Sequence, residues 1–175
     1  MIIMDKLNFE NLKNEIISAA IAAIDEMRTL HPREKIIAFA LYSDEGAMTV
    51  SNAINTLQHL QECQEEDPEH EFDYKFAPAE WKYEAEFATD AFAGISSKVR
   101  NGVSKDETDF CSFKKQLFQT CFGALQEIKS SYKDDMLWLF AVSDSEITQQ
   151  QIGWEYALNG DDTGKEFEEW ATSFS

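Results

Sequence analysis

The sequence of 175 residues has few basic side chains, few glycines and no long apolar run. Only 15 Lys and Arg stand against 33 Asp and Glu, which gives a formal net charge of −18 at pH 7. Because a nucleic-acid binder needs a basic surface to neutralise phosphates, this balance excludes a protein whose main ligand is DNA or RNA. No stretch approaches the roughly 18 consecutive apolar residues of a membrane-spanning helix, so we expect no membrane partner.

Cysteine is also scarce. Cys63, Cys111 and Cys121 are odd in number and form no CxxC pair, so neither a disulfide framework nor a redox motif is indicated. Cys121 falls on the apolar face of a predicted helix, and we interpret it as a small core residue. Residues 1–5 lack a basic flank and a small-residue cleavage site, so we expect no signal peptide. These features together predict a cytoplasmic protein.

The motifs of common enzymes and metal sites are missing. The seven glycines form neither a GxGxxG nor a GxxxxGK phosphate loop, and no HExxH, EF-hand or GxSxG pattern occurs. His59 and Cys63 share one face of a predicted helix, with His70 beyond, but a zinc site normally has four recognisable ligands. Glu80 and Glu84 are four positions apart, as are His59 and Cys63. A Glu pair without a catalytic partner is more typical of a solvated surface than of a glycosidase site. We therefore expect no metal and no cofactor.

What the sequence does have is enough apolar material for one core. Hydrophobic residues make up 43 % of the chain and include 13 Phe. Surface scaling lets a chain of this size bury about 70 % of its unfolded surface, so residues 1–175 are expected to form a single domain. Residues 161–175 are expected to be either a loosely docked tail or a segment attached through Phe167, Trp170 and Phe174.

Apolar residues at helical spacing predict two long helices and several short ones. The long helices are expected from Asn8 to about Leu30 and from Asp106 to Ile128. Short helices are expected after a cap at Asn55-Thr56, over Thr89–Val99, and from Ile147 to a C-terminal cap at Asn159-Gly160.

Two nearly unbroken apolar runs, 35–42 and 136–142, predict buried strands. Residues 43–46 read as a tight turn, and Met48–Ser51 as the second strand of a hairpin. A third strand is expected within Tyr74–Glu86, and a solvated loop over the acidic stretch Glu62–Asp73. The fold class is therefore α/β, more narrowly α+β, with a small, mostly antiparallel or mixed sheet covered by long amphipathic helices.

The negative charge is concentrated in two segments. Residues 62–90 and residues 134–175 each have a net charge of −9, whereas residues 91–133 have +3. One interpretation is that the acidic loops keep the protein soluble. The other is that they dock a basic protein, since complementary potentials raise the association rate and fix orientation. The residues of this candidate surface are Glu65, Glu66, Asp67, Glu69, Glu71, Asp73 and Tyr74.

Aromatic residues beside the acids are candidate anchors of that surface. Interface hot spots favour Trp and Tyr, so Tyr74, Trp154 and Trp170 would fill this role if they are exposed.

Three stretches carry a family resemblance. They are FALYSDEGAMTV at 39–50, followed by Asn55-Thr56; PAEWKYE at 78–84; and VSDS at 142–145. In this order they resemble a bacterial family, the domain of unknown function 4303, and the similarity extends from about Leu7 to Glu146.

The resemblance implies a small, single-domain bacterial protein with no established catalytic residues. It also implies a candidate immunity protein, because proteins of this kind often occur beside polymorphic toxins. The motif residues themselves we interpret as structural: Asp44 and Gly46 make the hairpin turn, Asn55 or Thr56 caps a helix, and Trp81 fills the core.

Three hypotheses remain open. The first is a non-enzymatic protein, monomeric or homodimeric, that binds and neutralises a basic protein toxin such as a nuclease. The second is an enzyme or small-ligand-binding protein with a polar pocket near the hairpin and the Pro78 to Glu84 motif, using Glu80, Glu84 and Asp144. The third is a homodimeric adaptor, which a large exposed apolar patch would indicate.

Overall fold

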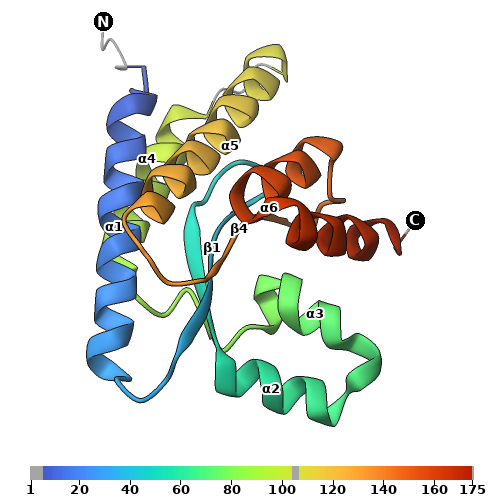
Figure 1. The fold of residues 1–175 in the computed structure, drawn as a ribbon. Coiled ribbons are helices and arrows are strands. Elements are labelled where there is room, and N and C mark those ends of the chain that lie inside the picture. Colours follow the sequence, from blue (N-terminus) through green and yellow to red (C-terminus); the bar gives the residue numbers. More distant parts are fainter. Residues whose placement is uncertain (1–5, 104–106, 175) are drawn as a thin grey trace, which may run out of the picture.

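The computed structural model describes residues 6–103 and 107–174, and its fold is α+β, as the sequence predicts (Figure 1). Six α-helices and two short 3-10 helices surround a mixed sheet of four strands in these residues. In chain order the elements are α1 (Phe9–Leu30), β1 (Ile36–Asp44), β2 (Ser51–Thr56), α2 (Leu57–Glu66), η1 (Pro68–His70), α3 (Glu71–Phe76), η2 (Pro78–Glu80), β3 (Tyr83–Glu84), α4 (Thr89–Gly102), α5 (Glu107–Ser130), β4 (Leu137–Ser143) and α6 (Gln149–Thr172).

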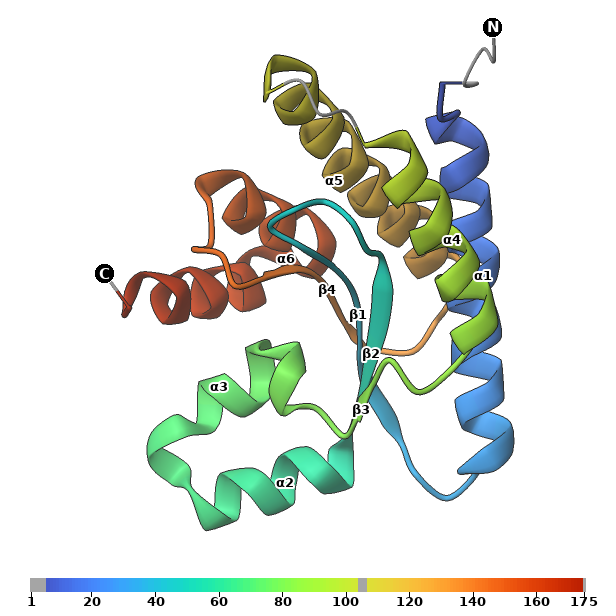
Figure 2. The same cartoon turned by 180° about the vertical axis from the view of Figure 1, so that it is seen from behind.

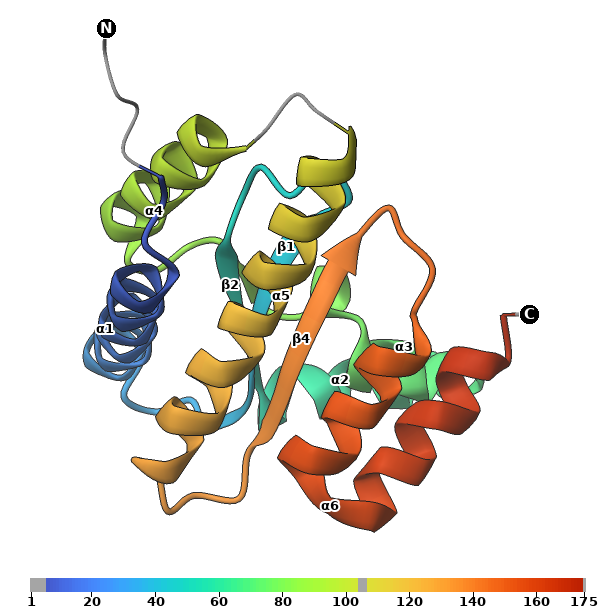
Figure 3. The ribbon, with the colours of Figure 1, turned by 90° about the horizontal axis from the view of Figure 1, so that it is seen from above.

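The sheet has the strand order β3-β2-β1-β4, and helices cover both of its faces. β1 pairs antiparallel with β2 and parallel with β4, so it is buried on both sides, as its apolar run predicts. Helices α1, α4 and α5 lie on one face, and α6 with the α2–α3 segment lies on the other (Figures 2 and 3). No helix in the described ranges is long and apolar enough to cross a bilayer.

The two faces of the sheet are packed differently because side chains alternate along a strand. Phe39 and Leu41 of β1 point into the larger apolar cluster beneath α1, α4 and α5. Ala38 and Ala40 point to the opposite side, into a smaller cluster beneath α6. Ala53 of β2 belongs to the same small cluster, so the α6 side of the sheet presents mostly short side chains.

The long helices and the buried strands lie where the apolar pattern predicts them. α1 begins after Asn8, whose side chain accepts a hydrogen bond from the Asn11 backbone N–H. Thr56 caps α2 in the same way, and Trp81 is buried in the smaller cluster. The predicted helix start at Asp106, like residues 1–5, lies outside the described residues.

The second strand of the hairpin was predicted at Met48–Ser51, and this is wrong, since β2 spans Ser51–Thr56. Asp44 explains the difference. Its carboxylate accepts hydrogen bonds from the backbone N–H groups of Gly46, Met48 and Thr49, which holds this segment in a loop.

The stretch Glu62–Asp73 was predicted to be a loop, and this is also wrong, because it is largely helical. α2 continues to Glu66, and Pro68 then opens η1, where its missing N–H and fixed φ are compatible with a first helical turn. The third strand, predicted within Tyr74–Glu86, is confirmed as the short β3 at Tyr83–Glu84, and α3 and η2 take up the first half of that range. We call the helical segment Leu57–Phe76 the acidic arm.

α6 contains the predicted break and continues beyond it. Gly160 has a positive φ of 83°, which ends the first helical segment, and a second segment runs on to Thr172. Phe167 in that second segment is buried, and Trp170 packs against Phe76 with ring centroids 5.7 Å apart. This part of the chain is therefore docked against α3.

α6 also covers the free edge of β4. The Asn159 side chain accepts a hydrogen bond from Trp138 N (2.9 Å) and donates one to Trp138 O (2.7 Å), as a neighbouring strand would. Its amide nitrogen also donates to Glu155 at 2.8 Å. Glu155 is only 1 % exposed, and burial raises the pKa of its carboxyl well above the usual value.

Candidate functional site

The acidic arm lies opposite the second segment of α6 (Figure 1). The predicted surface residues on the arm differ in their exposure to solvent. The side chains of Glu65, Glu66, Glu69 and Glu71 are exposed. Asp67 is half-buried and accepts hydrogen bonds from His70 Nδ1 (2.9 Å) and the Tyr74 hydroxyl (3.2 Å). The hydrogen bond from His70 lowers the pKa of Asp67. Asp67 and Tyr74 thus hold the arm together.

A groove of about 330 Å³ separates α3 from the end of α6. We call it the acidic groove, and its lining residues are Glu69, His70, Phe72, Asp73, Glu166, Glu169, Trp170, Ser173 and Phe174. The two strongly negative segments of the sequence therefore meet here, although Asp73 and Trp170 are 97 positions apart. The indole N–H of Trp170 donates to Asp73 at 2.8 Å, which ties α6 to α3.

Two exposed aromatic side chains rim the acidic groove. Phe174 is 67 % exposed and Phe72 is 39 % exposed. They are two of the four large apolar side chains that are exposed in the described ranges. Lys75 is close by, but it forms an ion pair with Glu166. The groove thus combines carboxylates with apolar surface.

Sequence reasoning missed Glu166, Glu169 and Phe72, and it considered Phe174 only as an attachment point of the C-terminal segment. Glu166, Glu169 and Ser173 have helical spacing around Trp170, and this pattern could have indicated one acidic helix face. Of the predicted anchors, Trp170 and Tyr74 are half-buried, whereas Trp154 is buried and stacks on Phe122 with ring centroids 4.9 Å apart. Because Trp154 is not exposed, it cannot serve as an anchor of the acidic surface.

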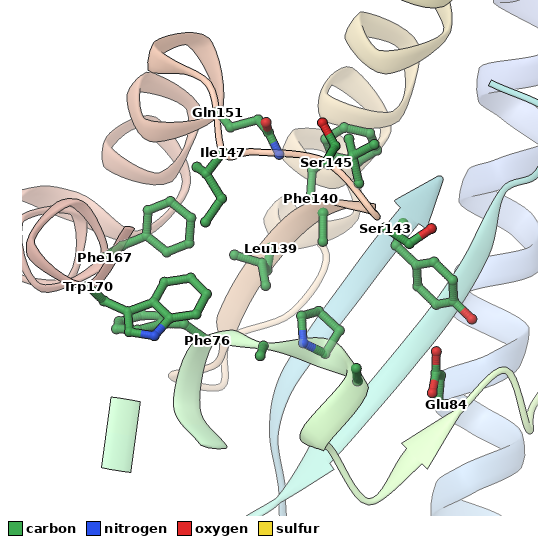
Figure 4. Close-up of a pocket in the computed structure, with 16 residues that line it drawn as sticks. Phe76, Glu84, Leu139, Phe140, Ser143, Ser145, Ile147, Gln151, Phe167 and Trp170 are labelled. Carbon is green, nitrogen blue, oxygen red and sulfur yellow. The ribbon is translucent and has the colours of Figure 1, made fainter. Parts of the chain in front are cut away.

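A second hollow, of about 230 Å³, lies between the sheet and α6 (Figure 4). We call it the sheet–α6 cavity. Its apolar lining includes Phe76, Pro78, Leu139, Ile147, Phe167 and Trp170, and its polar side chains are Tyr42, Glu84, Ser143, Ser145 and Gln151. The space exists because this face of the sheet carries small residues such as Ala141. Mostly apolar walls with a few polar groups are typical of sites for small molecules.

The polar groups of the sheet–α6 cavity lie at two ends (Figure 4). Tyr42 and Glu84 form one end, where burial raises the pKa of the Tyr42 phenol and Glu84 adds to the shift. Ser145 and Gln151 form the other, and Ser143 lies toward the Glu84 end (Figure 4). The Gln151 side chain also completes the cap of α6, because its Oε1 accepts from the Thr148 backbone N–H at 3.0 Å.

The three carboxylates proposed for a polar pocket do not share a cavity. Glu84 lines the sheet–α6 cavity, whereas Asp144 lines a separate depression with Glu146 and Phe174. Glu80 is exposed, and its backbone oxygen lies 3.0 Å from His59 Nε2.

The surroundings of His59, Cys63 and Cys121 in the described residues favour neither metal binding nor nucleophilic catalysis. His59 Nε2 lies 3.5 Å from Cys63 Sγ, and no group of three potential metal ligands occurs in the parts of the chain that the structure describes. Cys121 is fully buried, and burial raises the pKa of its thiol to about 12, which makes it a poor nucleophile at neutral pH.

Comparison with known protein families places most of the chain in one family model. Residues 16–159 match the family model described as domain of unknown function (DUF4303). The match covers most of the chain and includes the sheet, the acidic arm and the first segment of α6. No curated protein and no solved structure matches the chain.

Proposed function

The chain belongs to the DUF4303 family, and we propose that it is a non-enzymatic bacterial protein that binds and neutralises a basic protein toxin in the cytoplasm. The toxin docks against the acidic groove, between the acidic arm and the end of α6. The observation that carries this proposal is the meeting of two segments, each with a net charge of −9, at a groove with exposed aromatic rims.

Charge supports a basic partner. Glu69, Asp73, Glu166 and Glu169 line one groove, and Lys75 offsets only one of them. Such a concentrated field attracts a cationic protein and repels nucleic acid. A nuclease fits this chemistry, because carboxylates can occupy the cleft in which it binds phosphates.

Apolar surface supports a protein rather than a free cation. Phe72 and Phe174 can be covered by a partner, and burying an aromatic side chain stabilises a complex more than rim charges do. A Lys or Arg of the toxin that entered the groove would meet both carboxylates and an aromatic face, the arrangement of a cation–π contact.

The first experiment is co-purification of the tagged protein with the product of the adjacent reading frame, followed by a growth assay with and without the protein. We expect a stable complex and rescue of growth. A toxic neighbour that neither binds nor is neutralised would contradict the proposal.

Charge reversal then tests the docking surface. We expect Glu69→Lys with Glu169→Lys to slow association and to weaken its dependence on salt. The matched control is Asp25→Lys with Asp135→Lys, which changes net charge equally but at exposed positions on α1 and before β4. Equal effects of the two pairs would reject the groove as the docking surface.

A further inference from the structure

The sheet–α6 cavity contains a hydrogen-bond donor that no described residue uses. Gln151 is 6 % exposed, yet its Nε2 makes no hydrogen bond to any described residue. Figure 4 shows the amide nitrogen on the inward side of Gln151, facing the cavity. Because the amide oxygen is already bonded and the nitrogen faces the cavity, this donor is available to a ligand there.

Hydrogen bonds from Thr148 fix the orientation of the Gln151 side-chain amide. Oε1 accepts from Thr148 N at 3.0 Å and from Thr148 Oγ1 at 3.2 Å. A flipped amide would place two donors against the Thr148 N–H, so the nitrogen must occupy the other position. Gln151 thus presents N–H, and only N–H, to the cavity.

We propose that the sheet–α6 cavity binds a small, neutral, flat molecule with a hydrogen-bond acceptor such as a carbonyl at one end and a hydroxyl at the other. The acceptor meets Gln151, and the hydroxyl meets Glu84 at the opposite end (Figure 4), where the Tyr42 phenol is within hydrogen-bond reach of Glu84. This site is independent of the toxin-binding proposal.

The aromatic side chains that line the cavity favour a ligand with an aromatic ring. The Phe76 and Phe167 rings meet edge to face, with centroids 5.4 Å apart, and Trp170 packs against both. This cluster offers ring edges and faces to an aromatic ligand. Its volume of about 230 Å³ is below the usual range of roughly 300–1,000 Å³ for drug-sized ligands, so we expect about ten non-hydrogen atoms.

The probe that tests this is 4-hydroxyacetophenone, which has a ring, a carbonyl and a hydroxyl at its two ends. Binding is followed by amide chemical shifts in nuclear magnetic resonance, with 4-ethylphenol, which lacks the carbonyl, and acetophenone, which lacks the hydroxyl. We expect a Kd on the order of 1 mM for the probe, shifts around Ala141 and Gln151, and weaker binding of both analogues. Shifts with none of the three compounds, or equal affinity of 4-ethylphenol and the probe, would overturn the proposal.

Two variants assign the contact. Gln151→Glu keeps an acceptor for the Thr148 N–H but removes the donor, so the probe should bind about fivefold to tenfold more weakly while 4-ethylphenol is unaffected. Gln150→Glu, at the exposed neighbouring position, makes the same change in charge and should leave binding unchanged. A loss shared equally by both variants would overturn the role of Gln151.

A filled cavity provides the second check, which does not depend on Gln151. Ala141→Leu adds a side chain inside the lining and should abolish binding of all three compounds. Thermal unfolding establishes that each variant is folded. Undiminished binding to folded Ala141→Leu would place the ligand elsewhere and overturn the proposal.

Discussion

The two faces of the sheet are packed differently, although they are made by the same strands. Beneath α1, α4 and α5, large side chains such as Phe39, Ile54 and Trp138 are almost fully buried in the larger cluster. Beneath α6, alanines leave the sheet–α6 cavity and a smaller apolar cluster. Most of the buried apolar side chains therefore lie on one face, and the cavity lies on the other.

The strongest test of this comparison removes a large side chain from the packed face. Phe39 is fully buried and its ring centroid lies 5.8 Å from that of Trp138. We expect Phe39→Ala to lower the free energy of unfolding by about 3–5 kcal/mol, measured by chemical denaturation. Ala141→Leu, on the cavity face, should change it by less than about 1 kcal/mol, since the added group enters existing space. Similar losses in both variants would mean that the faces are equally packed.

The difference between the faces depends on the register of β1, because a slip of one residue would exchange them. Asp44 fixes the loop that follows. Although burial opposes ionisation, hydrogen bonds from Thr49 and from the Met48 and Thr49 N–H groups lower the pKa of Asp44 below its usual value. We expect Asp44→Ala to cost about 2 kcal/mol at pH 7.

The contribution of Asp44 to the free energy of unfolding should decrease as the pH falls. A carboxylate with a lowered pKa in the folded state stabilises the protein above its unfolded value of about 3.8 and loses this contribution as pH falls through the folded pKa. The gap between wild type and Asp44→Ala should therefore narrow in acid. Asp44→Asn, which keeps one acceptor, should lose less stability. A gap that stays constant down to pH 2 would contradict this account.

Glu155 tests the contact between α6 and the edge of β4. Burial raises the pKa of Glu155, so the folded state retains a proton that the unfolded state releases above about pH 4.5. Stability is then fully present below that pH and falls as pH rises toward the folded pKa. Glu155→Gln, which cannot ionise, should remove this decline. If the free energy of unfolding changes in the same way from pH 4 to 8 in the wild type and in Glu155→Gln, this explanation is wrong.

The smallest effect on folding is expected on the acidic arm. Glu65 and Glu66 are exposed at the end of α2 and form no ion pair in the described residues. Glu65→Lys with Glu66→Lys should change the free energy of unfolding by no more than about 0.5 kcal/mol, as measured by thermal denaturation. These two residues do not line the acidic groove, so association with a basic toxin should slow less than after reversal of Glu69 and Glu169.

The parts of the fold that follow from local chemistry were predictable. Apolar spacing predicts α1 and α5, apolar runs predict β1 and β4, and the Thr56 cap predicts the start of α2. The helical structure of Glu62–Asp73 was not predictable in this way, because many acidic residues and a proline are equally typical of a loop.

The candidate sites needed the tertiary structure. Asp73 and Trp170 meet only because α6 bends at Gly160 and returns to α3. The capping box of Thr148 and Gln151 is a readable sequence pattern, but it indicates only a helix start. That the amide nitrogen of Gln151 faces a cavity depends on residues far away in the sequence, such as Phe76, Pro78 and Glu84, which line the same space.

The Asn159 side chain has one further consequence, for the behaviour of the protein at high concentration. An uncovered edge strand offers free N–H and C=O groups, on which a strand of another molecule can add and start aggregation. At Trp138 both groups are already bonded to Asn159, and α6 lies along this edge of the sheet. One amide side chain thereby helps to keep an apolar strand of the sheet from recruiting other molecules.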